Sequence, residues 1–135
     1  MKPEKRAKPK RRNMEPEVKT ININGVEYIQ ADQFRPAEKL DNMRYVIVRT
    51  YSAGVFAGYL KNRDGKEVTL LKARRLWYWD GEASLSQLAM EGVSKPQNCK
   101  FPCEVDEIEL TEAVEIINCT EKSRKSIKGV DIWKQ

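Results

Sequence analysis

The residues best suited to chemistry form a short run of arginines and aromatics near the middle of the chain. Arg74 and Arg75 are followed, one residue later, by Trp77, Tyr78 and Trp79. An aromatic plane can stack on a nucleobase, and a guanidinium binds phosphate through paired hydrogen bonds. In a strand, Arg75, Trp77 and Trp79 would share one face and Arg74 and Tyr78 the other. The run predicts a nucleotide site, although tryptophans packed in the core beneath the arginines would explain it as well.

Two weaker candidates could complete such a site. Arg49, Tyr51 and Ser52 stand at a predicted strand end, where the small residues up to Gly54 let a ligand approach the backbone. The same residues fit a plain hairpin turn that requires glycine, and the chain has no phosphate-loop motif. Ser84 begins a predicted helix, whose free N–H groups can hold an anion. An ordinary serine N-cap would explain Ser84 equally well.

Composition argues against catalysis. The 135 residues include no histidine, which excludes Ser-His-Asp and Cys-His catalysis and histidine-ligated metals. Of three cysteines, Cys99 and Cys103 are close in sequence but Cys119 is distant, so a zinc site would lack its usual fourth ligand. The acidic residues of 104–109 suit a solvated strand face better than a catalytic carboxylate pair. We therefore expect no enzyme, no metal and no cofactor, and reduced thiols.

Positive charge is concentrated at the start of the chain. The net charge is +5, but residues 1–12 alone carry seven cations and one acid. The remaining residues are close to neutral, so a nucleic-acid argument from charge applies only to this arm. Its prolines and scarcity of apolar residues predict disorder. The seven cations are Lys2, Lys5, Arg6, Lys8, Lys10, Arg11 and Arg12.

The candidate residues must be positioned by strands and helices, and the sequence pattern predicts which ones. It predicts an α+β fold with a mostly antiparallel sheet of five or six strands and two short helices. Asn24-Gly25 predicts a hairpin across 20–29, followed by a linker to residue 42. The predicted domains are a disordered arm (1–19), a hairpin and linker extension (20–42) and a globular domain (43–135). The expected strands of that domain are 44–51, 55–61, 67–71, 72–79, 104–110 and 113–119, and 72–79 could instead form a strand, a turn and a second strand. The expected helices are 84–91 and 121–128, and Ile132 and Trp133 should fold back as a strand or plug.

Residues 43–134 resemble a family of small bacteriophage proteins of unknown function. The resemblance rests on RYVIVRTYSAGVFAGYLKNRDGKEVTL, on ARRLWYWDGEASLSQLA, and on TEKSRKSI near the end of the chain. In size and in its arginine and aromatic content this family is similar to phage proteins that sequester the cyclic nucleotide signals of bacterial CBASS immunity. The resemblance implies a small phage protein of that kind without assigning any binding residue.

The leading hypothesis is a non-catalytic, homo-oligomeric phage protein that sequesters a cyclic dinucleotide in the cytoplasm of the infected host. Arg74 and Arg75 would meet phosphates, and Trp77, Tyr78 or Trp79 would stack a base. Arg49, Tyr51 and Ser52 would close the pocket. One alternative is a minor virion or assembly protein, and another is nucleic-acid binding through the arm. No apolar run is long enough to span a membrane, so no membrane partner is expected.

Overall fold

The computed structural model describes residues 20–23, 26–29 and 34–134, and it divides the chain into two units at residue 33. In the first unit, β1 (Thr20–Ile23) and β2 (Val26–Ile29) pair antiparallel with Thr20 opposite Ile29. This pairing confirms the predicted hairpin strands. The Asn24-Gly25 turn and the basic arm with its seven cations lie outside the described residues.

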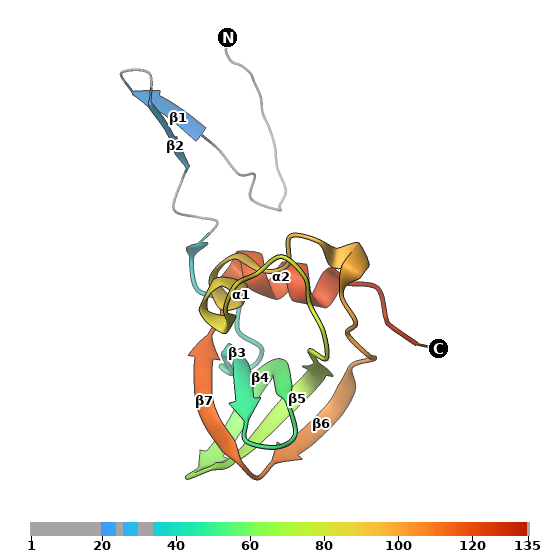
Figure 1. Cartoon of the computed structure of the whole chain (residues 1–135). Helices are drawn as coiled ribbons and strands as arrows, with labels where there is room; N and C mark the ends of the chain where they lie inside the picture. Colours follow the sequence, from blue (N-terminus) through green and yellow to red (C-terminus); the bar gives the residue numbers. More distant parts are fainter. Residues whose placement is uncertain (1–19, 24–25, 30–33, 135) are drawn as a thin grey trace. The chain divides into compact units, whose positions relative to one another are not determined.

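The second unit holds an antiparallel five-stranded sheet and the helices (Figure 1). This arrangement confirms the predicted α+β class. Along the sheet the strand order is β6-β5-β4-β3-β7. The strands are β3 (Tyr45–Thr50), β4 (Val55–Asp64), β5 (Glu67–Arg75), β6 (Val105–Leu110) and β7 (Ala113–Asn118). The helices are α1 (Leu85–Glu91), the 3-10 helix η2 (Pro96–Asn98) and α2 (Glu121–Gly129).

The sheet curls because its two outer strands are neighbours in the sequence. β6 and β7 lie at opposite edges of the sheet, yet only Thr111 and Glu112 separate them. Figure 1 shows the two strands meeting at the lower end of the molecule. There the Tyr51 N–H donates to the Glu112 carbonyl at 2.9 Å, and the Ala113 N–H donates to the Lys66 carbonyl at 3.0 Å. These bonds tie the corner to the ends of both neighbouring hairpins.

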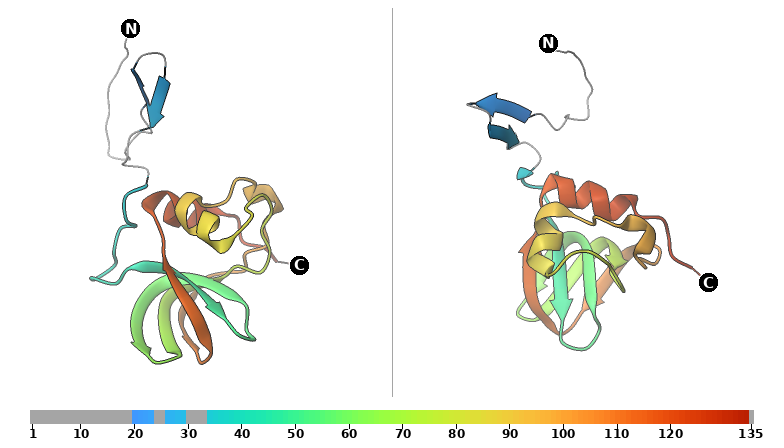
Figure 2. Two further views of the ribbon diagram at one scale, coloured as in Figure 1. Left: turned by 60° about the vertical axis from the view of Figure 1, so that its left-hand side comes forward. Right: turned by 45° about the horizontal axis from the view of Figure 1, so that its top comes forward.

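Each face of the curled sheet has its own core, because successive residues of a strand point to opposite faces. In β3, Tyr45 and Ile47 pack in the core that also contains Leu88 of α1 and Ile127 of α2. Val46 and Val48 pack in the second core, inside the curl. The rest of that second core is Phe56, Val68, Leu70, Ala73 and Leu110. Figure 2 shows the helices on one side of the strands and the sheet bending away on the other.

A β-bulge in β5 decides which of the two adjacent arginines is buried. Tyr59 pairs with Leu71 and Ala57 with Arg74, so three steps along β5 match two along β4. Lys72, inside this interval, has φ +50°. The extra residue reverses the alternation, so Arg74 reaches α2 while Arg75 lies over a ring of the second core. β5 ends at Arg75, so an unbroken strand through residue 79 was wrong beyond that point, whereas Tyr78 pairs again in an isolated bridge with Lys100.

The globular unit begins earlier than the expected boundary at Met43. The Ala37 N–H donates to the Cys119 carbonyl at 3.1 Å, and the Glu121 N–H donates to the Arg35 carbonyl at 2.9 Å. Ala37 is buried in the core beneath the helices, and Leu40 packs against it. Residues 34–42 therefore belong to this unit by backbone hydrogen bonding and burial, neither of which their polar composition indicated.

We expect Gly92→Ala to destabilise the protein more than Gly65→Ala. Both glycines have positive φ, +78° and +61°, so either alanine would be strained, and Gly92, with ψ −161°, lies in a region that essentially only glycine adopts. A Cβ on Gly92 would lie 2.5 Å from the Ser126 Cβ, whereas one on Gly65 meets nothing within 4 Å. This crowding should lower the free energy of unfolding by roughly 1–3 kcal/mol more, measured by urea denaturation. Equal losses would contradict the close packing of α1 on α2.

Candidate functional site

An exposed group of three aromatic rings and one lysine is the main candidate. We call it the aromatic–lysine cluster, and it consists of Trp77, Tyr78, Lys100 and Trp133. The Trp77 and Trp133 rings stack with centroids 4.9 Å apart and planes at 17°. The Lys100 ammonium lies 5.5 Å, 5.7 Å and 5.8 Å from the Trp77, Tyr78 and Trp133 centroids. Trp77 is 58% exposed and Tyr78 48%, so the cluster is open to solvent.

Three chain segments far apart in sequence build the cluster. Tyr78 and Lys100 exchange backbone hydrogen bonds of 3.3 Å and 2.8 Å. The Trp133 N–H donates to the Phe101 carbonyl at 3.0 Å, beside a parallel bridge between Phe101 and Ile132. Phe101 is fully buried, so it anchors the middle segment to the core. The expected return of the C-terminal residues is confirmed, and it brings Trp133 onto Trp77.

Arg74 holds these segments from beneath. Its Nε donates to the Pro102 carbonyl at 2.9 Å, Nη1 to the Ile127 carbonyl at 2.8 Å and Nη2 to the Phe101 carbonyl at 3.1 Å. The side chain is 4% exposed, and burial lowers the pKa of its guanidinium. The group stays charged, because arginine does not deprotonate in proteins. The prediction that Arg74 meets a ligand phosphate does not fit this burial, and the residue instead positions the cluster.

Arg75, the last residue of β5, contacts the β3–β4 loop, which consists of residues 51–54. Its Nη1 donates to the Ala53 carbonyl at 2.7 Å, and its guanidinium carbon lies 4.4 Å from the centroid of the Phe56 ring. Thr50 shapes the loop, because its Oγ1 donates to the Gly54 carbonyl at 2.7 Å and accepts from the Ala53 N–H at 3.0 Å. Arg75 is therefore exposed but already oriented by backbone and ring.

Two other polar residues predicted around that loop, Arg49 and Ser52, are bonded to carboxylates. Arg49 pairs with Glu115 at 2.6 Å, and the Ser52 hydroxyl donates to the Glu112 carboxylate. Tyr51 is 80% exposed. Among the described residues, no hydrogen bond, ion pair or ring contact joins Arg49, Tyr51 or Ser52 to the aromatic–lysine cluster. The structure thus places the predicted residues Trp77 and Tyr78 in the aromatic–lysine cluster, and Arg49, Tyr51, Ser52 and Arg75 around the β3–β4 loop.

The last two predicted residues have structural roles. Trp79 is half-buried and packs against the core beneath the helices. Ser84 caps α1, with its hydroxyl accepting from the Gln87 N–H at 3.2 Å, which is the ordinary N-cap interpretation. Sequence reasoning missed Lys100 as a site residue, because nothing in its loop marks it. For Trp133, the only signal was the expected return of the C-terminal residues.

The cysteines do not form a metal centre among the described residues, where no group of three or more metal-binding side chains occurs. Cys99 and Cys119 are buried and Cys103 is exposed. Burial raises the pKa of the Cys99 thiol and raises that of Cys119 to about 12, despite a hydrogen bond with Ser123. The two buried thiols are therefore protonated near neutral pH and poor nucleophiles.

Comparison with known proteins places the chain in a family. The family model described as Domain of unknown function (DUF6948) matches residues 43–127, which is more than half of the chain, and the protein belongs to that family. No curated protein and no solved structure matches the chain. Among the described residues, no helix is long and apolar enough to cross a membrane.

We expect Arg74→Lys to lower the free energy of unfolding by about 3 kcal/mol, because a compact ammonium replaces a fork that donates to three carbonyls. The near-UV circular dichroism of the tryptophans should weaken in the folded variant as the cluster loosens. Arg75→Lys is the matched control and should stay within about 0.5 kcal/mol of the parent. Similar small losses in both variants, measured by urea denaturation, would refute the positioning role.

We also expect one fast-reacting thiol in the native protein. Cys103 should react with dithiobis-nitrobenzoate at the rate of a free thiol, whereas Cys99 and Cys119 should react only after unfolding in guanidinium. Cys103→Ser should remove the fast phase and leave the other two thiols unchanged. A fast phase that persists in this variant would show that the helical layer does not enclose the other thiols.

Proposed function

We propose that the protein binds a nucleotide without reacting with it, and that the aromatic–lysine cluster is the binding surface. One observation carries the proposal: Lys100 stands beside the stacked Trp77–Trp133 pair, of which Trp77 is exposed and Trp133 half-buried. Among the described residues, no carboxylate forms an ion pair with Lys100. Its ammonium is therefore available to a phosphate, and the exposed rings are available to a base.

Stacking energy makes the cluster a reasonable base platform. The stacking of a base on an aromatic side chain contributes roughly 1–3 kcal/mol to the binding free energy. Trp77 is already held against Trp133, so binding would not have to order it. A lysine–phosphate hydrogen bond adds roughly 1.5–3 kcal/mol. Binding would thus combine one stacked base with one phosphate contact, without a nucleophile or a general base.

The finer proposal is that the ligand is a cyclic dinucleotide immune signal, and that the protein is a phage product that sequesters it in the cytoplasm of the infected host. The resemblance to small phage proteins supports this proposal. A cyclic dinucleotide has two bases and two phosphates, whereas one chain presents one cluster. A homo-oligomer with a two-fold axis would bring two clusters to one ligand, since isologous dimers are the commonest assemblies.

A second candidate is single-stranded nucleic acid, and the openness of the cluster favours it. An exposed aromatic platform accepts successive bases of a strand without enclosing them. The seven cations of residues 1–12 would add phosphate contacts whose strength falls steeply with salt. The third hypothesis, a minor virion or assembly protein that docks to a partner through its edges, stays a prediction, and mass spectrometry of purified particles would test it.

We expect a cyclic dinucleotide to quench the tryptophan fluorescence of the full chain, with a dissociation constant in the micromolar range or below. Trp77→Ala should weaken binding roughly 5- to 150-fold, which corresponds to one lost stacking contact. Lys100→Gln should weaken it at least roughly tenfold. Isothermal titration calorimetry checks both values independently of the tryptophan signal.

The matched controls are Tyr51→Ala, which removes an exposed aromatic outside the cluster, and Lys66→Gln, which removes an exposed lysine outside it. Both should bind within about twofold of the parent. A single-stranded oligonucleotide that binds tightly through Trp77, while cyclic dinucleotides do not bind, would favour the second candidate. No binding of either ligand at micromolar protein, or equal binding by the Trp77→Ala variant, would reject the proposal.

A further inference from the structure

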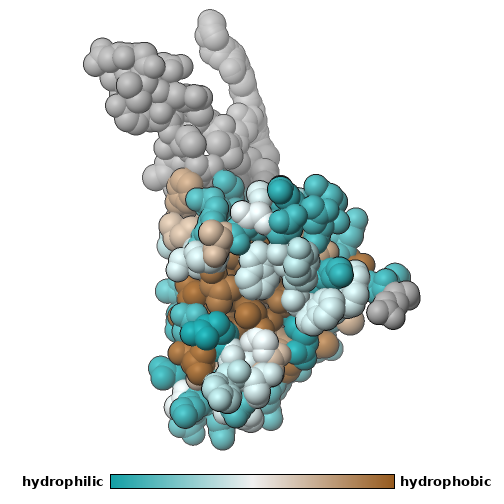
Figure 3. All heavy atoms as spheres, viewed as in Figure 1, coloured by the Kyte–Doolittle hydropathy of each residue, from teal (hydrophilic) through white to brown (hydrophobic). Residues whose placement is uncertain are grey.

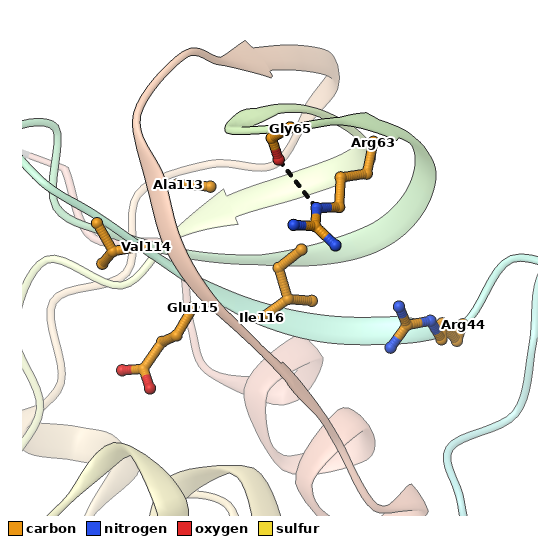
Figure 4. Close-up of a pocket in the computed structure, with 7 residues that line it drawn as sticks. All are labelled: Arg44, Arg63, Gly65, Ala113, Val114, Glu115 and Ile116. Carbon is orange, nitrogen blue, oxygen red and sulfur yellow. Dashed lines mark hydrogen bonds between the residues drawn. The ribbon is translucent and has the colours of Figure 1, made fainter.

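A pocket away from the aromatic–lysine cluster lies at the side of the curled sheet, between β7 and the far end of β4 (Figure 4). Its volume is about 260 Å³, which is room for a small ligand. Arg44 just before β3, the end of β4 with Gly65 of the following turn, and β7 line it, and none of these residues belongs to the aromatic–lysine cluster. We call it the two-arginine pocket after Arg44 and Arg63.

The charge of this pocket is positive. Figure 4 shows the guanidinium groups of Arg44 and Arg63 on the same side of β7 as the Ile116 side chain. The Glu115 carboxylate points to the other side of β7, where it pairs with Arg49 at 2.6 Å. Among the described residues, no carboxylate forms an ion pair with Arg44 or Arg63. Glu115 also lines the pocket, but its carboxylate points away from the two guanidinium groups, neither of which has an acidic partner in the described part of the chain.

Neutral hydrogen bonds orient the two arginines and leave further donors free. The Arg44 Nη1 donates to the Asn118 side-chain oxygen, and the Arg63 Nε donates to the Gly65 carbonyl at 2.9 Å. A guanidinium has five N–H donors, so each group keeps four for another acceptor. Paired guanidinium donors match the oxygens of a phosphate or a carboxylate.

The floor of the pocket is apolar. Ile116 and Ala113 of β7 are half-buried and pack against the second core, inside the curl. Figure 3, in the view of Figure 1, shows apolar residues in brown at the surface over the region of β3 and β7. An apolar group of a ligand lying on Ile116 would be removed from water at about 0.8 kcal/mol per buried methylene.

From this arrangement we infer a binding site for a small amphiphilic anion. A phosphate or carboxylate head lies between Arg44 and Arg63, and a short apolar body lies on Ile116 and Ala113. The site is independent of the proposed nucleotide binding, because it shares no residue with the aromatic–lysine cluster and its ligand needs no base. The chemistry is shared by alkyl phosphates and short-chain carboxylates, which separate probes distinguish.

The site is tested by titrating the full chain with hexyl phosphate, hexanoate and inorganic phosphate. The readout is 15N NMR of the arginine Nε–Hε signals. Hexyl phosphate should shift the Arg44 and Arg63 signals with a submillimolar dissociation constant, at least roughly tenfold tighter than inorganic phosphate. The Arg44→Gln/Arg63→Gln double variant should weaken binding at least roughly tenfold, measured by calorimetry. Both arginines are exposed, so the double variant should keep the parent's far-UV circular dichroism.

Ala113→Leu separates the apolar contribution from charge. The leucine should fill the pocket and so weaken the binding of hexyl phosphate at least roughly fivefold. The affinity for inorganic phosphate should stay within about twofold of the parent's. Arg75→Gln and Trp77→Ala, both outside the pocket, should bind hexyl phosphate like the parent. Equal binding by the arginine double variant would overturn the inference. So would the absence of any shift of the Arg44 and Arg63 signals with all three probes at about 10 mM, which is at least roughly tenfold above a submillimolar dissociation constant. Loss of nucleotide binding alone would leave it standing.

Discussion

The structure depends on one buried cation whose partners are backbone carbonyls rather than an acid. Arg74 donates to the carbonyls of Phe101, Pro102 and Ile127, which belong to the loop before β6 and to α2. Burying a charge without such partners would cost several kcal/mol, so the guanidinium and the three carbonyls require one another. The loop that carries Lys100 and the chain that carries Trp133 are built on this contact.

Two adjacent arginines have different roles because a bulge in β5 turns them in different directions. The bulge at Lys72 turns Arg74 toward the helices and Arg75 toward the β3–β4 loop. Arg74 uses its donors inside the protein, and Arg75 lies at the surface over Phe56. The side chains proposed to bind are therefore ones that the buried arginine helps to position.

Local patterns in the sequence were enough for most of the fold and for part of the site. β-branched runs predicted the strands of the sheet, and Ser84 and Thr120 marked the helix starts through capping. The alternation along β5 could not be predicted, because a bulge depends on pairing with a neighbouring strand. Trp77 and Tyr78 were identified from residue type alone. Lys100 was not, because its position beside the rings depends on contacts between segments distant in sequence.

The most direct test of this account is hydrogen exchange at the Arg74 side chain in the unmodified protein. Its Nε–Hε proton, followed by 15N NMR with the exposed Arg75 as internal reference, reports burial and hydrogen bonding without any substitution. We expect the Arg74 proton to exchange at least roughly a hundredfold more slowly than that of Arg75. Equal exchange rates would mean that Arg74 is not held by the three carbonyls, and the proposed support of the aromatic–lysine cluster would be wrong.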